Sequence, residues 1–329
     1  MRESGNEALH EGILLCSNPQ CLSEYPVVDG IPLLLSDLRT YVAQSIHPLL
    51  SRTDLSSTME SLLGDCCGPG SAFDLQRQYL STYVFNHYVD FDTDASDFEA
   101  VLPGTVANVL RKGLTLLDRE PAGLVLDLGC SVGRTTFELA RRSNDLVLGL
   151  DLNFSMLRTA ATIVNSRTVT YDRRKGGIVF ERRSFPVEFP RTELVDFWAC
   201  DVTNLPFADA GMALCTSMNL IDCVSSPYDH LRELTRVLQP GGAALLASPY
   251  DWSAQATALE SWLGGHSQRT SNQGNSAAIL RSLFAGGEHP HALTGLTLAA
   301  EAENVPWTLR LHDRSFITYL SHLAAGRKT

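Results

Sequence analysis

The feature that most constrains the fold is an apolar run that leads into a glycine-containing loop. Residues 123–127 are mostly apolar, residues 129–133 begin and end with glycine, and a helical pattern follows over residues 134–142. This order predicts a buried strand, a tight loop and a helix. Glycines at such a loop let the backbone turn sharply and approach a ligand, which in open α/β sheets lies at the carboxyl ends of the strands.

Apolar and amphipathic segments continue to alternate along the rest of the chain. They predict strands over 146–151, 197–201, 212–218 and 243–247, a helix over 228–238, a turn over 239–242, and a final antiparallel pair of strands over 307–311 and 316–320. Alternation of this kind is typical of a mostly parallel sheet flanked by helices. We therefore expect an α/β fold.

The chain divides into three predicted regions. Residues 1–40 form a small module, residues 41–118 a helical connector or lid, and residues 119–329 the α/β domain. Hydrophobic residues make up 44% of the chain, enough for a sizeable core. A basic insertion, residues 171–193, separates the helix after the second strand from the third strand. We expect its charges to lie in a solvated loop or hairpin.

The net charge and the pattern of apolar residues limit the binding partners and the cellular compartment that we expect for this chain. The formal net charge is −11, which repels phosphate backbones, so we expect no nucleic-acid partner. We find no secretory signal and no run of 18 apolar residues, so we expect no membrane span. Eight cysteines without such a signal predict reduced thiols in a cytoplasm.

The chemistry of the loop narrows the class of ligand. The loop is Gly129-x-x-x-Gly133, without the third glycine of a dinucleotide site or the Gly-Lys-Ser/Thr of a phosphate-binding loop. A nucleoside without a phosphate chain therefore suits it better. Asp151 ends the second strand and can accept both ribose hydroxyls, while Asp201 ends the third and can meet an adenine amino group. Each residue alone could be a helix cap or a solvated strand end.

Asn219 after the fourth strand and the turn before the fifth complete an ordered set. Over residues 124–250 this set resembles the class I S-adenosylmethionine-dependent methyltransferases. The resemblance implies a Rossmann-like seven-stranded sheet and S-adenosylmethionine as the cofactor. The residues that it assigns to the cofactor are Asp127, Gly129, Cys130, Gly133, Asp151, Leu152, Met156, Asp201, Val202 and Asn219.

The flanking segments carry a narrower resemblance. Ser248-Pro249-Tyr250-x-Trp252, Glu260-x-Trp262-Leu263-Gly264-Gly265, Arg314-x-Phe316 and His87-Tyr88 resemble the C-terminal methyltransferase domain of ovothiol synthases, over about residues 79–328. That family N-methylates the imidazole ring of a 4-mercaptohistidine. The sulfoxide-synthase portion of the family is absent here. Asp222 also departs from the family, since a non-acidic residue is expected at its position.

This resemblance implies a small-molecule acceptor, and an imidazole acceptor needs side chains that orient the ring and accept its N–H. The catalytic candidates are Asp222 and Tyr250, and the substrate-binding candidates are His87, Tyr88, Trp252, Trp262, Arg314 and His322. A pocket covered by residues 79–88 would hold the acceptor. Structural alternatives stay open: the tryptophans can be packing residues, His322 an interior histidine, Arg314 the partner of a structural acid, and Cys130 a small packing residue.

The N-terminal module carries a different resemblance. Cys16, Cys21 and the run from Tyr25 to Leu35, with a turn at Asp29-Gly30, resemble the second half of a Trm112-like domain, a small zinc-ribbon-type fold. A structural zinc site needs four nitrogen or sulfur ligands, and this segment supplies two. Cys66 and Cys67 could complete the set. We favour a metal-free module and assign no metal ligand, with zinc as the alternative.

Three functions follow from these features. The first is an enzyme that N-methylates a small histidine-derived, optionally thiol-bearing substrate. The second is a methyltransferase that acts on RNA or protein through the Trm112-like module. The third is a non-catalytic cofactor- or protein-binding partner, which the intact cofactor set argues against. The sequence gives no oligomeric state.

Overall fold

A computed structural model of the chain describes residues 11–16, 19–20, 22–28, 31–32, 38–44, 52, 54–94, 103–117, 122–284 and 289–329. The contacts divide the chain into two compact units. The first unit comprises residues 1–82, 170–184 and 310–316, and the second unit comprises the remainder. The domain boundaries at residues 40 and 118 stay a prediction.

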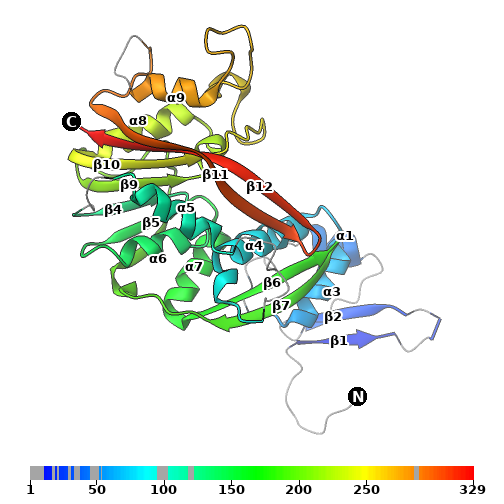
Figure 1. The fold of residues 1–329 in the computed structure, drawn as a ribbon. Helices are drawn as coiled ribbons and strands as arrows, with labels where there is room; N and C mark the ends of the chain where they lie inside the picture. The colour runs from blue at the N-terminus through cyan, green and yellow to red at the C-terminus, as the bar shows by residue number, and fades with distance from the viewer. Residues whose placement is uncertain are drawn as a thin grey trace. The chain divides into compact units, whose positions relative to one another are not determined.

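The second unit is built on a mainly parallel sheet (Figure 1). Among the described residues, its seven strands are β4 (Val125–Leu128), β5 (Val147–Asp151), β8 (Val195–Ala199), β9 (Met212–Met218), β10 (Leu238–Ser248), β11 (Leu296–His312) and β12 (Ser315–Lys328). Their order is β11-β12-β10-β9-β4-β5-β8. The pairs from β8 to β10 are parallel, and β12 runs antiparallel to β10. The structure therefore confirms the predicted Rossmann-like α/β sheet.

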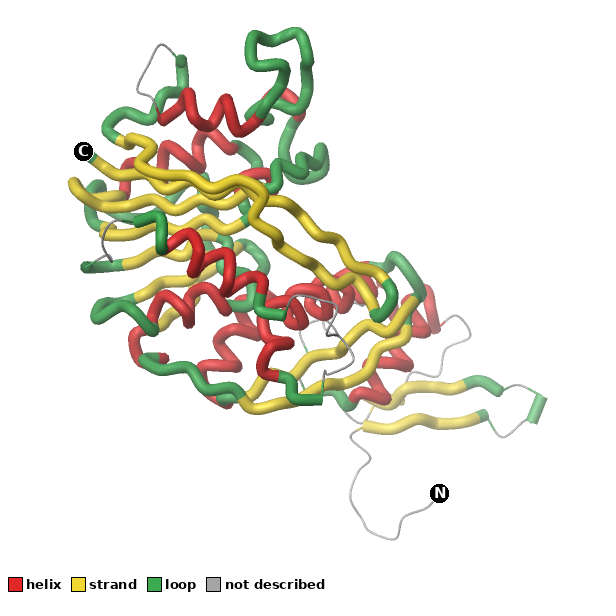
Figure 2. Tube along the Cα trace, viewed as in Figure 1, coloured by secondary structure: helices red, strands yellow, loops and turns green. Residues whose placement is uncertain are grey.

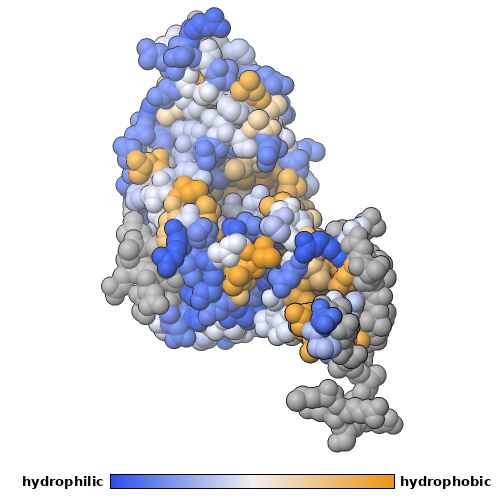
Figure 3. All heavy atoms as spheres, turned by 90° about the vertical axis from the view of Figure 1, so that its right-hand side faces the viewer, coloured by the Kyte–Doolittle hydropathy of each residue, from blue (hydrophilic) through white to orange (hydrophobic). Residues whose placement is uncertain are grey.

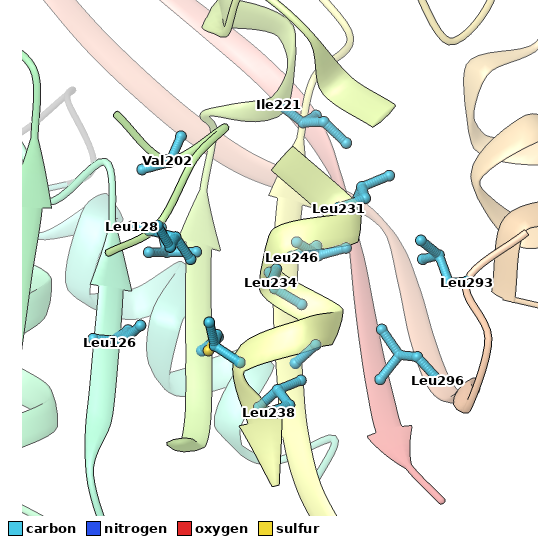
Figure 4. Close-up of a cluster of buried hydrophobic side chains, with 14 of the residues drawn as sticks. Leu126, Leu128, Val202, Ile221, Leu231, Leu234, Leu238, Leu246, Leu293 and Leu296 are labelled. Atoms are coloured by element: carbon cyan, nitrogen blue, oxygen red, sulfur yellow. The ribbon is translucent and has the colours of Figure 1, made fainter. Parts of the chain in front are cut away.

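Helices cover both faces of this sheet (Figure 2). They are α5 (Thr105–Leu114), α6 (Arg134–Ala140), α7 (Phe154–Ser166), α8 (Pro227–Val237) and α9 (Ser276–Phe284). Helices α5 and α6 pack on one face, whereas α8 and α9 pack on the other. Successive strand residues point to opposite faces, so β4 supplies Val125 to the first core and Leu126 and Leu128 to the second. Figure 4 shows the second core, where Leu231 and Leu234 of α8 lie beside Leu246 of β10.

The segment predicted as a turn over residues 239–242 differs from the prediction. It lies inside β10, and the pairing with β9 shifts between Leu238 and Ala243. A Cβ atom on Gly242 would come within 2.8 Å of the Gln239 carbonyl oxygen. The glycine thus permits a close backbone approach within the strand, so the Pro-Gly-Gly signal marks a bulge rather than a strand boundary.

The final two strands are longer than predicted. The apolar pattern located only residues 307–311 and 316–320, whereas β11 and β12 span 17 and 14 residues. The first part of β11 alternates between half-buried and exposed residues, with polar side chains outward. A hydrophobicity pattern therefore underestimates its length, because only the central residues are buried on both faces.

The first unit contains an antiparallel sheet, a hairpin and helices. Its elements are β1 (Glu11–Leu15), β2 (Glu24–Val28), β3 (Ile31–Pro32), α1 (Leu38–Gln44), α3 (Ser57–Cys67), the first part of α4 (Ala72–Tyr88), and most of β6 (Thr168–Gly176) and β7 (Val179–Pro186). The strands β6 and β7 pair with each other, so the basic insertion is a hairpin as predicted. Arg182 of β7 forms ion pairs with Asp172 of β6 and Glu60 of α3.

The Trm112-like module stays a prediction. Cys21, the Asp29-Gly30 turn and residues 33–35 lie outside the described residues. Cys16, Cys66 and Cys67 are free thiols. Within the described part of the chain, no group of three or more His, Cys, Asp or Glu side chains could hold a metal ion. No described helix is both long enough and apolar enough to cross a membrane.

Candidate cofactor and acceptor site

The glycine loop turns sharply at the carboxyl end of β4. The Gly129 and Cys130 amides both donate to the Leu150 carbonyl oxygen of β5, at 2.8 and 3.0 Å. Gly133 has a φ of 89°. A Cβ atom there would lie 2.7 Å from the Phe197 ring and 2.9 Å from the Ala160 Cβ, so a side chain at this position is excluded by both conformation and space.

Asp127 anchors the loop from inside the protein. Its side chain is buried, with 1% of the residue exposed. The carboxylate accepts hydrogen bonds from the hydroxyls of Thr135, Thr136 and Thr216, at 2.6, 2.7 and 2.8 Å. Burial raises the pKa of Asp127, while the three hydroxyls oppose that rise. We therefore revise the prediction of direct contact: Asp127 positions the loop by tying β4 to α6 and β9.

Asp151 holds the glycine loop against the end of β5. Its Oδ2 accepts the Ser131 amide at 2.9 Å, and its Oδ1 accepts the Asn153 amide at 2.8 Å. Each carboxylate oxygen keeps a further lone pair. Burial raises the pKa of Asp151, and the backbone donors lower it. The helix-cap alternative is excluded, because Asn153 caps α7.

Exposed apolar side chains follow Asp151 directly. Leu152 is 71% exposed and Phe154 is 68% exposed. Hydrophobic patches also occur elsewhere on the surface, as Figure 3 shows, so exposure alone does not mark a ligand site. Here an apolar surface adjoins a carboxylate at the sheet edge, and this pair of features fits an adenosine better than a phosphorylated ligand.

The third strand end lies beside the second. The Cys200 amide donates to the Asp151 carbonyl oxygen at 3.1 Å. Asp201 is exposed, and its Oδ1 accepts the amide and the hydroxyl of Thr203 at 2.9 and 2.7 Å. Its second oxygen stays available for a ligand donor. The residues at this edge would fit S-adenosylmethionine, and the placement of Asp151 on the ribose and Asp201 near the base stays a prediction.

Three other predicted cofactor residues are buried. Val202, Met156 and Cys130 are each at most 6% exposed. The Ser131 hydroxyl donates to the Met156 Sδ at 3.2 Å. Burial raises the pKa of the Cys130 thiol well above its usual range, so this cysteine is neutral and serves as a packing residue.

Three of the positive-φ residues other than glycine lie at strand ends, and others lie in turns elsewhere in the described chain. Ser131 after β4, Asn219 after β9 and Tyr250 after β10 have φ values of 52°, 51° and 57°. Residues other than glycine seldom adopt this left-handed region, and such strain clusters at ligand sites. Asn219 is held by its amide, which donates to Ala247, and by its Oδ1, which accepts the Ser321 hydroxyl at 3.0 Å.

Asp222 lies in the 3-10 turn η4 (Ile221–Cys223) and joins the ends of β9 and β10. It is 2% exposed, and burial raises the pKa of its carboxyl. Its Oδ2 accepts the Asp251 amide at 2.8 Å, and its Oδ1 accepts the Ser248 hydroxyl at 3.3 Å. The alternative that Asp222 caps the next helix is wrong, because the Ser226 side chain caps α8.

Aromatic side chains form a row next to Asp222. The Tyr250 and Trp252 ring centroids are 6.4 Å apart, and the Trp252 and Trp262 centroids are 5.9 Å apart, with both pairs stacked. The Trp252 indole donates to the Ser276 hydroxyl and the Trp262 indole to the Thr257 carbonyl oxygen, at 3.1 and 2.9 Å. The indole N–H groups are thus satisfied within the protein. Because Trp252 stacks on both Tyr250 and Trp262, only the ring edges and the outer faces of the row are left for a ligand.

The remaining substrate candidates occupy different environments. Tyr88 is fully buried and donates to the Val132 carbonyl oxygen at 2.6 Å, so it supports the glycine loop. His87 is buried, its Nδ1 has no hydrogen-bond partner among the described residues, and burial lowers its pKa to about 3. Arg314 is exposed in the turn between β11 and β12, within the first unit. Its role in binding stays a prediction.

The sequence assigned no role to several residues that the structure places in the candidate site. Thr135 and Thr136 directly follow the loop, so their hydroxyls could have been found from their position alone. Ser321 and Glu301 come from distant strands, and no local pattern marks them. His322 was predicted, but its partners were not: it binds Tyr250 and Glu301.

Comparisons with known proteins agree with this geometry. Residues 126–246 match the family model for a methyltransferase domain. An uncharacterized methyltransferase of Mycobacterium sp. (strain KMS) is 32% identical over 111 residues, which are 30% of this chain and 44% of that protein. The malonyl-[acyl-carrier protein] O-methyltransferase of Marinomonas sp. (strain MWYL1) is 28% identical over 141 residues, 43% of each chain. The chain thus spans less than half of the length of these curated relatives.

Solved structures show a weaker likeness. The YcgJ protein of Bacillus subtilis is 16% identical, with a TM-score of 0.43 over 68% of this chain and 98% of that one. A score this low adds nothing to the fold described above. The family match, the strand order and the loop at β4 together make residues 126–246 a class I S-adenosylmethionine-dependent methyltransferase domain.

Proposed function

We propose that this chain transfers the methyl group of S-adenosylmethionine to a ring nitrogen of a small, histidine-derived substrate, which can also carry a thiol. The observation that carries the proposal is the buried Asp222 carboxylate beside the row of Tyr250, Trp252 and Trp262, at the carboxyl ends of β9 and β10. A flat ring with one N–H donor matches a carboxylate next to aromatic faces.

The chemistry of an imidazole acceptor requires little from the protein. S-adenosylmethionine supplies an already activated methyl group when it is bound. An imidazole with a pKa of about 6.5 is largely neutral at pH 7, and its free lone pair can attack without a strong base. The protein must orient the ring and exclude water. Asp222 keeps lone pairs that can accept the ring N–H, and the tryptophan faces favour the cationic product.

Other acceptors make different demands on the site. The formal net charge of −11 disfavours RNA, whose phosphates would be repelled. The Marinomonas relative is named for a malonyl-[acyl-carrier protein]. A malonyl carboxylate would be repelled by an ionised Asp222, so this acidic residue favours an acceptor with a donor group over one with an anion.

A substrate panel tests the proposal. The protein is incubated with methyl-labelled S-adenosylmethionine and histidine, 4-mercaptohistidine, a histidine dipeptide, simple thiols, malonyl-acyl carrier protein and bulk RNA. We expect label on an imidazole nitrogen, assigned by NMR of the product, and an Asp151→Ala variant that labels none of the acceptors at the same cofactor concentration. Label on RNA, protein or the malonyl group, with every histidine derivative unlabelled, contradicts the proposal.

A further inference from the structure

We propose that Tyr250, His322 and Glu301 form a proton relay that carries the acceptor's proton from the methylation site to solvent. This inference rests on the proposed function. The Tyr250 Oη lies 2.8 Å from the His322 Nδ1, and the His322 Nε2 lies 3.1 Å from the Glu301 Oε2. Both distances are those of ordinary hydrogen bonds, so the three side chains form a continuous path.

The relay crosses three neighbouring strands of the sheet. Tyr250 follows β10, His322 lies in β12 opposite Ser248 in the strand register, and Glu301 lies in β11. His322 is 4% exposed, whereas the Glu301 side chain is 35% exposed. The path therefore runs from the hydroxyl of a half-buried tyrosine to a carboxylate that solvent reaches.

The surrounding charges set the direction of the hydrogen bonds. Arg281 of α9 donates to Glu301 at 2.8 Å and lowers the pKa of that carboxyl, which keeps it ionised. An ionised Glu301 accepts from the His322 Nε2–H, so Nδ1 is left as an acceptor. Burial raises the pKa of Tyr250, and its hydroxyl donates to Nδ1. The other charged groups around the relay are Glu303 and Asp222.

In the proposed step each bond and proton is accounted for. The nitrogen lone pair of the acceptor forms the new N–C bond, while the C–S bond breaks and its electron pair stays on sulfur. The methylated ring then carries a positive charge and an acidic N–H. In this step the ring N–H is a three-centre donor to Asp222, which orients it, and to the Tyr250 oxygen. Its proton passes to the Tyr250 oxygen as the Tyr250 proton passes to the His322 Nδ1. His322 becomes an imidazolium beside Glu301 and releases its Nε2 proton to that carboxylate or to water.

The step needs no strong base, because the Tyr250 hydroxyl bridges the acceptor ring to the His322 ring. Glu301 stabilises the imidazolium that forms, as the acid does in a Ser-His-Asp triad. Tyr250 is then a catalytic residue, since it contacts the acceptor. His322 and Glu301 act through Tyr250 and are positioning residues.

A matched pair of glutamate variants tests the relay. Glu303 also binds Arg281, but it lies 4.0 Å from the His322 Nε2, beyond hydrogen-bond distance. We expect Glu301→Gln to lower kcat about tenfold with KM within about twofold, and Glu303→Gln to leave both within about twofold. A purely structural role would lower the melting temperature of both variants and would leave kcat of the folded protein unchanged.

A second measurement follows the proton directly. Wild-type protein should show a solvent deuterium isotope effect on kcat. Tyr250→Phe should lose that effect and about 100-fold in kcat, because the bridging hydroxyl is gone. Equal kcat values for Glu301→Gln and Glu303→Gln, or a Tyr250→Phe variant that keeps the isotope effect, would overturn the relay. A wild type that methylates only a non-imidazole acceptor contradicts the proposed function, and the same variants then measure the relay on that acceptor.

Discussion

The two halves of the sheet edge are held together in different ways. At the ends of β5 and β8, acidic side chains accept from residues close in the chain: Asp151 from Asn153, and Asp201 from Thr203. At the ends of β9, β10 and β12, the side chains meet across long separations. Asn219 and Ser321 are 102 residues apart, and Tyr250 and His322 are 72 apart.

This difference explains which part of the site a sequence reveals. The cofactor half, by which we mean the proposed cofactor residues at the ends of β4, β5 and β8, is built from short segments whose spacing is visible in the chain. The hydrogen bond between Asp127 and Thr216, 89 residues apart, is its long-range link. The acceptor half exists only after β12 has paired with β10, because β12 delivers Ser321 and His322. We infer that cofactor binding depends mainly on local structure, whereas acceptor recognition depends on the C-terminal hairpin.

Loss of the Asp127 carboxylate should have the largest effect. In Asp127→Ala, three buried hydroxyls lose their shared acceptor. We expect the free energy of unfolding to fall by about 3–5 kcal/mol, measured by denaturant titration. The control Thr216→Val removes one of the three donors and should cost about 1 kcal/mol. If Asp127→Ala costs no more than Thr216→Val, Asp127 does not organise the strand ends as described.

Loss of the Asp151 carboxylate should act on the cofactor half alone. Asp151→Ala removes the proposed acceptor for the ribose hydroxyls and releases the Ser131 amide. We expect binding of S-adenosylhomocysteine to weaken by about 2–3 kcal/mol, measured by calorimetry. Asp201→Ala, at an exposed strand end, should weaken it by about 1 kcal/mol or less. If Asp151→Ala binds S-adenosylhomocysteine with unchanged affinity, Asp151 does not bind the ribose hydroxyls.

Neutralising Asp222 should act on the acceptor half alone. In Asp222→Asn, kcat/KM should fall roughly ten- to a hundredfold, or about 1.5–3 kcal/mol, because the ring N–H loses a charged acceptor. Binding of S-adenosylhomocysteine should be unchanged. If the melting temperature falls while kcat/KM is kept, Asp222 serves only to tie Ser248 and Asp251 to η4.

The sequence predicted most of the fold, and for the candidate site it predicted the positions of the glycine loop and of the strand-end residues. The strand over 212–218 was located to the residue, because a buried central strand is a continuous apolar run. The bulge in β10 was wrongly predicted as a turn, because a Pro-Gly-Gly sequence is compatible with a turn and with a bulge. The glycine loop and Asp151 lie where the pattern placed them. The links from His322 to Tyr250 and Glu301 could not be predicted, because strand register is fixed by tertiary packing.

The smallest expected effect concerns His87, which adjoins the cofactor half through Tyr88. Its pKa is about 3 in the folded protein and about 6.5 in an unfolded chain. Below pH 6.5 the unfolded chain therefore binds more protons at this residue than the folded protein does, so acid destabilises the fold. The cost is absent above pH 6.5 and grows by about 1.4 kcal/mol for each pH unit below it, until pH approaches 3.

The His87→Phe variant isolates this contribution. His230, whose pKa is lowered to about 4, adds a slope of the same sign, and the raised pKa of Asp127 and Asp222 adds one of opposite sign. Only the difference between wild type and variant is therefore diagnostic. Between pH 6.5 and 5.5 the wild type should lose about 1 kcal/mol more than His87→Phe, measured by denaturant titration at each pH. Parallel pH curves would show that the pKa of His87 is the same in the folded protein and the unfolded chain, which would contradict the lowering of this pKa by burial.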